Sequence, residues 1–143
     1  MESILAGLEH PPHRKKEENK LVEIQETHKK FRKELSAGTV SLALLSILTQ
    51  AEEPLYGYQI GKLVGTGNDE SESVIPKQGA IYPVLRSLEI QGLLSSEREM
   101  SDSGPPRKYY LATETGREAL QRWEEIWKET KSFVDKVLGG DYQ

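Results

Sequence analysis

The chain has 143 residues, no cysteine and a formal net charge of −4. This length predicts one domain with appendages, and the lack of cysteine excludes disulfides, thiolate metal sites and thiol chemistry. No apolar run approaches the roughly 18 residues of a membrane span, and the first residues lack the charge order of a secretory signal, so we expect a cytoplasmic protein.

The N-terminal quarter predicts a tail followed by a helix. Residues 1–14 have no periodicity, so we expect a mobile tail, and the two prolines between His10 and His13 argue against a metal site there. Residues 15–35 form an N-terminal extension with a helical pattern. Its seam advances in steps of three and four residues: Leu21, Ile24, His28, Phe31 and Leu35. Such a narrow seam is typical of a helix that packs on another helix.

A second helix is predicted after a break in the chain. Ser36-Ala37-Gly38 indicates the break, and the apolar residues between 40 and 50 indicate the new helix. Glu52-Glu53-Pro54 then predicts a stop and a turn.

A short helix over residues 58–64 follows and ends before Gly65. Residues 65–73 are rich in glycine and acidic side chains, which predicts a loop. Residues 73–75 are predicted to form a short strand.

The third helix opens on Gly79 and ends at Gly92, which suits a left-handed C-terminal stop. Gly79, Pro83 and Arg86 are expected on its exposed side, with Pro83 close enough to the first turn for its missing N–H to cost little. The opposite side is one apolar stripe: Ile81, Val84, Leu85 and Leu88.

A hairpin follows this helix, with strands at about 94–100 and 107–112 around an SDSGPP turn. Arg107 and Lys108 stand beside the turn. Basic residues at the tip of a hairpin after a helix are typical of a wing that contacts a DNA backbone.

The last helix is expected over residues 114–138, with Thr113 as its N-cap. One small domain cannot bury its long apolar stripe, so we expect a homodimer built on this helix. The predicted interface residues are Leu120, Trp123, Trp127, Thr130, Val134 and Val137.

These elements predict a mainly α fold with a small β-wing: a winged helix-turn-helix, a long C-terminal dimerisation helix and an N-terminal extension helix. The expected segments are 1–35 for the tail and extension, 36–113 for the winged domain and 114–143 for the dimerisation helix.

DNA is the partner that the third helix and the wing favour. Residues 76–110 hold five basic and four acidic groups, and the acidic excess lies elsewhere in the chain. Gly79 lets helix amides approach a phosphate. Candidate groove and phosphate contacts are Lys77, Gln78, Arg86, Arg107 and Lys108.

Several motifs together resemble the PadR family of transcriptional regulators. They are PLYGYQI at 54–60, GAIYPVLRSLE at 79–89, Gly92-Leu93, and in the wing Gly104, Arg107-Lys108-Tyr109-Tyr110, Thr113 and Gly116. The resemblance covers about residues 37–138. The chain departs from the family where Tyr56 replaces a common histidine, where Ala112 replaces a usual leucine, and in its N-terminal extension.

The resemblance implies a homodimeric repressor that acts on double-stranded DNA. It places Tyr82 at the family's helix-three tyrosine, close to the DNA backbone, and Gly79, Arg86, Arg107 and Lys108 at DNA-facing positions. Some members bind small aromatic effectors, for which Trp123 and Trp127 would be the platform here.

Two other classes of function remain open. A winged helix used only for protein contacts is compatible with the acidic total charge. An enzyme is disfavoured, because no nucleophile–base pair, metal cluster or phosphate loop stands out; we expect no cofactor and no metal.

Overall fold

The computed structural model describes residues 12–67, 73–101 and 103–142. The chain divides into two units, residues 1–36 and 37–143. Most of the predicted tail and the middle of the predicted acidic loop lie outside the described residues.

The first helix, α2 (Pro12–Gln50), contributes to both units and corrects two predictions. It begins at Pro12 rather than near residue 15, because proline suits the first turn of a helix. The predicted break at Ser36-Ala37-Gly38 is wrong, since the helix runs through it. One glycine inside a helix costs only about 1 kcal/mol, which the burial of apolar side chains in the following turns offsets. In the first unit, the seam side chains of Leu21, Ile24, Phe31 and Leu35 are exposed.

A two-residue strand, β1 (Leu55–Tyr56), lies between α2 and α3 (Gly57–Val64). The strand predicted at 73–75 does not form, so the predicted element order is wrong on this point. The strand forms at 55–56 instead because Leu55 and Tyr56 pair with Tyr110 and Tyr109 of a later strand.

The helix α4 (Gln78–Ile90) precedes a hairpin of β2 (Leu94–Ser101) and β3 (Gly104–Ala112). The three strands form an antiparallel sheet in the order β1-β3-β2. Both hairpin strands extend further toward the tip than predicted. The two prolines at the start of β3 are tolerated there, because β1 pairs only with the other end of β3 and leaves this end as an edge.

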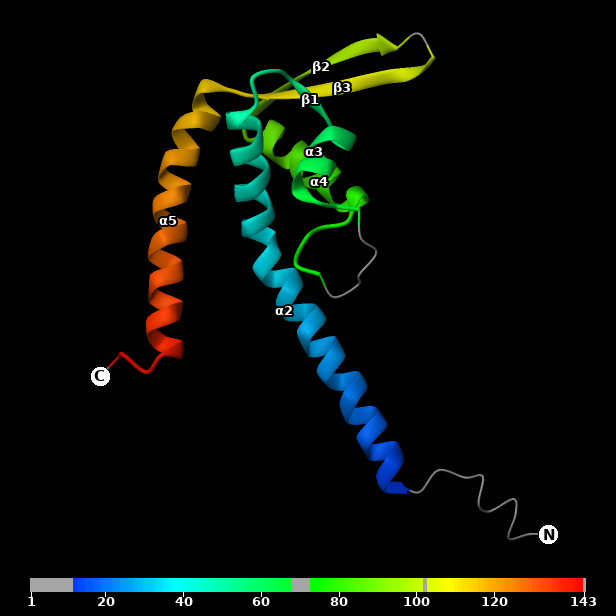
Figure 1. Ribbon diagram of the computed structural model, residues 1–143, viewed down its shortest axis with the longest axis vertical. Helices are drawn as coiled ribbons and strands as arrows, with labels where there is room; N and C mark the ends of the chain where they lie inside the picture. Colours follow the sequence, from blue (N-terminus) through cyan, green and yellow to red (C-terminus); the bar gives the residue numbers. More distant parts are fainter. Residues whose placement is uncertain (1–11, 68–72, 102, 143) are drawn as a thin grey trace, which may run out of the picture. The chain divides into compact units, whose positions relative to one another are not determined.

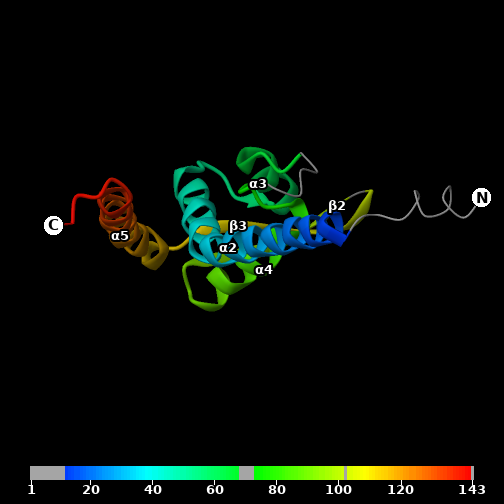
Figure 2. The same ribbon diagram turned by 90° about the horizontal axis from the view of Figure 1, so that it is seen from below.

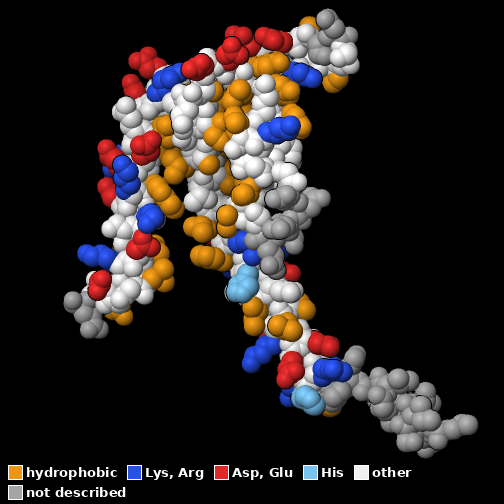
Figure 3. Space-filling model, in the orientation of Figure 1, with side chains coloured by type: hydrophobic (Ala, Val, Ile, Leu, Met, Phe, Trp, Pro, Cys, Tyr) orange, Lys and Arg blue, Asp and Glu red, His pale blue; other side chains and the backbone are white. Residues whose placement is uncertain are grey.

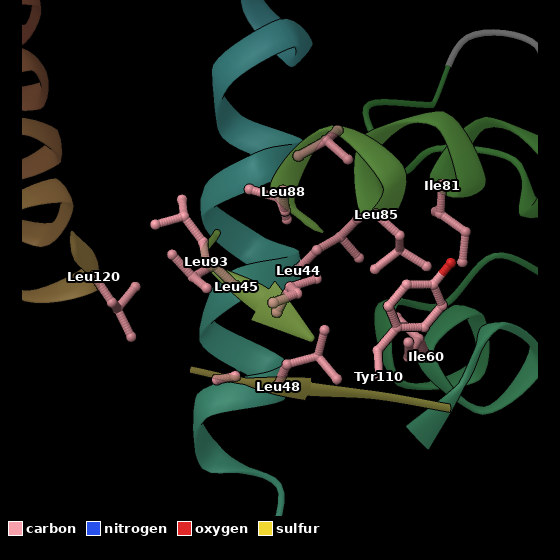
Figure 4. Packing of buried hydrophobic residues seen from close by; sticks show 13 residues of the cluster. Leu44, Leu45, Leu48, Ile60, Ile81, Leu85, Leu88, Leu93, Tyr110 and Leu120 are labelled. Carbon is pink, nitrogen blue, oxygen red and sulfur yellow. The ribbon is translucent and has the colours of Figure 1, made fainter. Parts of the chain in front are cut away.

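The core lies between α2, α4 and the sheet in the second unit (Figure 4). Leu44, Leu45 and Leu48 of α2 meet Leu85 and Leu88 of α4, and all five side chains are almost fully buried. The predicted α4 stripe is therefore the buried side of that helix. Gly92 has the expected left-handed backbone, with φ of 80°.

The last helix, α5 (Glu114–Leu138), has the predicted bounds. The Thr113 hydroxyl caps it by accepting from the N–H of Gly116 at 2.9 Å, and donates to the carbonyl of Gly92 at 2.7 Å. The N–H of Thr113 donates to the carbonyl of Leu93 at 3.1 Å. Thr113 thus joins the residues after α4, the start of β2 and the start of α5. Figures 1 and 2 show that the chain passes from the end of β3 directly into α5.

Among the described residues, no helix is long and apolar enough to cross a bilayer. The architecture confirms the predicted fold class, a mainly helical winged helix with a small three-stranded sheet.

Candidate nucleic-acid interface

The outer side of α4 carries most of the predicted DNA-contacting residues. Lys77, Gly79 and Arg86 are exposed, and Tyr82 is 41% exposed. A Cβ atom added at Gly79 would meet nothing within 4 Å, so this turn of the helix has open space in front of it. All four of these predicted residues are therefore accessible, and Gly79, Tyr82 and Arg86 recur along α4 at the spacing of one helix side.

Gln78 differs from these residues because its side chain is engaged within the protein. Its Nε2 donates to the carbonyl of Gly57 at 3.0 Å and to the hydroxyl of Tyr82 at 3.2 Å. Its Oε1 accepts from the hydroxyl of Thr66 at 2.9 Å. The helical pattern alone placed Gln78 beside Gly79 and could not reveal these bonds.

The two predicted wing cations point to opposite faces of the hairpin, because they are neighbours in one strand. The Nζ of Lys108 lies 3.2 Å from Oε1 of Glu89 on α4. Hydrogen bonding from Ser96, and then the hydrogen bond and charge of Lys108, lower the pKa of Glu89 below its usual range, while partial burial opposes them. Lys108 is thus half-buried in the middle of the hairpin with a carboxylate beside it.

Arg107 lies on the other face, over the ring of Tyr56 at 4.6 Å from its centroid. Tyr109 meets the edge of the same ring at 5.4 Å between centroids. Arg107 remains exposed, and this stacking restrains its guanidinium beside the aromatic pair.

Arg98 is a wing cation that our sequence reasoning missed. It lies directly across from Lys108 in the β2–β3 register and is exposed. The signal for it was the hairpin register, which places residues 98 and 108 opposite each other. The neighbouring Glu97 and Glu99 contribute to acidic side chains along the outer edge of the hairpin (Figure 3).

The predicted dimer residues on α5 fall into two groups. Leu120 is 9% exposed and belongs to the core of its own subunit, and Trp123 packs against that core. Leu120 therefore has almost no surface to offer a partner, contrary to its predicted role. Beyond this point the apolar stripe is exposed, with charged side chains on the other side of the helix (Figure 3): Ile126, Trp127, Phe133, Val134, Val137 and Leu138.

Within the second unit, an open hollow of about 330 Å³ lies between α2 and α5. Trp127 lines it, whereas Trp123, the other predicted effector residue, does not. The remaining lining is small or apolar apart from one carboxylate: Thr39, Leu42, Ala43, Ser46, Leu120 and Glu124. Among the described residues, no three His, Asp or Glu side chains gather as metal ligands.

Residues 44–122, from the core helix to the start of α5, match the model of the transcriptional regulator PadR-like family. The chain belongs to this PadR-like family. A curated relative, transcriptional regulator Rv3488 of Mycobacterium tuberculosis, is 42% identical over 62 residues, which are 43% of this chain. The matched part spans 54% of that relative, about half of its length.

Solved structures of PadR-like regulators have the same fold. The PadR family transcriptional regulator of Eggerthella lenta superposes with a TM-score of 0.65 at 32% identity, over 82% of this chain and 96% of the other. A PadR-like transcription factor from Bacteroides fragilis gives 0.58 at 30% identity, over 76% and 98%. These matches confirm the predicted PadR-like identity and winged-helix fold of this protein.

Proposed function

We propose that this PadR-like protein is a sequence-specific DNA-binding repressor that acts as a homodimer on a palindromic operator. The observation that carries the proposal is the outer side of α4, where the open turn at Gly79 is followed at helical spacing by exposed Tyr82 and Arg86 and preceded by exposed Lys77. A helix with a buried apolar side and an accessible polar side after a short helix is the reading element of a winged helix.

Each part of this surface has a distinct proposed contact. The open space at Gly79 lets a phosphate approach the first turn of α4, where the helix dipole favours negative charge. Tyr82 adds a hydroxyl near the backbone, and Lys77 a charge. Arg86 lies further along the helix and is the candidate for a bidentate contact with guanine.

The homodimer is proposed to form through the exposed part of the α5 stripe, from Ile126 to Leu138. These side chains leave a large apolar strip in water if the chain stays alone. Because Leu120 is buried in its own subunit, the proposed interface begins near Trp127, with Trp123 at its margin. A two-fold axis through α5 presents two α4 helices to the two halves of a palindrome.

An effector is proposed to release the repressor from DNA. The hollow between α2 and α5 suits a small aromatic ligand, since Trp127 supplies a flat apolar wall. Trp123, four residues earlier on α5, packs against the core and does not line this hollow.

A second candidate is a winged helix that binds another protein instead of DNA. The pairing of Lys108 with Glu89 and the acidic residues beside Arg98 favour it, because they reduce the positive charge of the wing.

The test is capture of genomic fragments by the wild-type protein, followed by titration of a captured duplex and a scrambled duplex. A repressor retains specific fragments, and Arg86→Ala then reduces the discrimination between the two duplexes by about 1–3 kcal/mol per half-site. Failure to retain any DNA at low salt would reject the repressor in favour of the protein-binding candidate.

A further inference from the structure

Three hydrogen bonds join the Gln78 side chain to three other parts of the winged domain. The amide group bonds to Gly57 at the start of α3, to Thr66 just after α3, and to Tyr82 one turn further along α4. Gln78 therefore bridges both ends of α3 to the first two turns of α4.

The side of α3 that faces α4 leaves room for the side chains of Gln78 and Tyr82. A Cβ atom at Gly61 would overlap Oε1 of Gln78, and a Cβ atom at Gly57 would overlap the ring of Tyr82. Both glycines are buried. Any side chain at either position would displace the amide or the ring, so the glycines are matched to Gln78 and Tyr82.

The first turn of α4 lacks two bonds that commonly stabilise the start of a helix. Pro83 lies close to the first turn as predicted, but in the second turn, where its missing N–H does remove a helical bond. Because proline has no N–H, it cannot donate to the carbonyl of Gly79 four residues earlier. The N-cap residue Lys77 makes no side-chain capping bond either.

We propose that Gln78 is a positioning residue, which holds the first turn of α4 and the Tyr82 hydroxyl in place for DNA, and does not itself read a base. This inference rests on the proposed DNA-binding function. It replaces the groove-contact role predicted for Gln78, since a base contact would require its amide to leave three partners within the protein.

The first test needs no DNA. Hydrogen exchange is measured on full-length wild type, Gln78→Met and Gln91→Met. Methionine keeps the length of the side chain but removes the bonds without adding charge. Gln91, the residue that follows α4, is the matched control, because both bonds described for its amide go to Ser87 one turn earlier. We expect the amides of residues 57–66 to exchange roughly tenfold faster in Gln78→Met, with those of α5 unchanged in both variants.

The second test uses a duplex that the wild type selects from a random 30-base-pair pool. Gln78→Met should bind it about tenfold more weakly than the wild type or Gln91→Met. A repeated selection with Gln78→Met should return the same preferred base at every position, because a positioning residue affects the geometry of all contacts. Gly61→Ala, which displaces the same amide, should reproduce both results.

Two results would overturn the positioning role. One is unchanged exchange in residues 57–66 of Gln78→Met. The other is a changed base preference at one position in each half-site, which would make Gln78 a base reader. If the wild type selects no duplex, the repressor proposal fails, and the exchange measurement still decides whether Gln78 holds α3 and α4 together.

Discussion

Glu89 is held by contacts that depend on its charge, so its contribution to stability depends on pH. Its folded pKa lies below the ordinary value of 4.5. The stabilisation is therefore present above that value and is lost as the pH falls through the lower folded pKa. Glu89→Gln should reduce the free energy of unfolding at pH 7 by no more than about 1 kcal/mol, because both partners of the ion pair are partly exposed.

Urea unfolding at pH 7 and at pH 3.5 measures this effect, and Glu97→Gln, an exposed change in the same sheet, is the control. The loss of unfolding free energy caused by Glu89→Gln should be smaller at the lower pH. A deficit of equal size at both values would show that shape, and not charge, is what Glu89 contributes.

Two glycines should respond to alanine in opposite directions. A Cβ atom at Gly116 would overlap the backbone carbonyl of Leu93, which cannot move aside without shifting the hairpin. A Cβ atom at Gly38, inside α2, would meet nothing within 4 Å. Thermal unfolding should show a loss of about 1–3 kcal/mol for Gly116→Ala and a gain of about 0.5–1 kcal/mol for Gly38→Ala. Equal changes in the two variants would contradict the packing at Gly116.

At the scale of elements, the wing should contribute unequal charges to DNA binding. Arg98 and Arg107 are exposed, whereas Lys108 faces Glu89. In a homodimer, each alanine substitution removes two copies of a cation. Arg98→Ala and Arg107→Ala should each flatten the slope of log K against log salt by roughly two units, and Lys108→Ala by less.

Salt titrations on selected and scrambled duplexes measure these slopes. Both duplexes should lose similar affinity, because phosphate contacts carry no sequence information. A steeper loss for Lys108→Ala than for the two arginines would mean that Lys108 leaves Glu89 when DNA binds.

A charged side chain placed in the apolar stripe of α5 should disrupt the proposed dimer. Trp127→Glu would bury an unpaired carboxylate in each subunit of the proposed dimer, and should give monomers or aggregates. Gln121→Glu adds the same charge at an exposed position of the same helix and should remain dimeric. Sedimentation equilibrium at tens of micromolar distinguishes these states. A wild type that sediments as a monomer would refute the dimer itself.

At the scale of the whole molecule, the extension helix should stabilise the dimer more than it serves DNA binding. Its seam, from Leu21 to Leu35, is apolar and exposed in the chain alone. Deletion of residues 1–33 should therefore lower the melting temperature more than it weakens binding to a selected duplex. A deletion that abolished DNA binding while leaving the dimer intact would identify the extension as a DNA-binding arm.

Sequence-based prediction succeeded where the interactions are between residues close in sequence, and failed where they join residues far apart in sequence. The α4 stripe and the start of α5 at Thr113 were predictable, because periodicity and capping are local signals. The strand β1 was missed, since two residues have no period and Tyr56 becomes a strand residue only by pairing with Tyr109. The roles of Gln78 and Lys108 depend on partners far away in the sequence, which no local pattern contains.

Thr113 links the position of α5 to the position of α4. Its hydroxyl bonds to the end of α4 and to the start of α5, so a single side chain joins the helix proposed to read DNA to the helix proposed to hold the dimer. In such a dimer, α5 would pivot about its N-terminal end at Thr113. A small tilt at the hollow beside Trp127 would then change the spacing of the two α4 helices, and a spacing that no longer matches one turn of the double helix would release the operator.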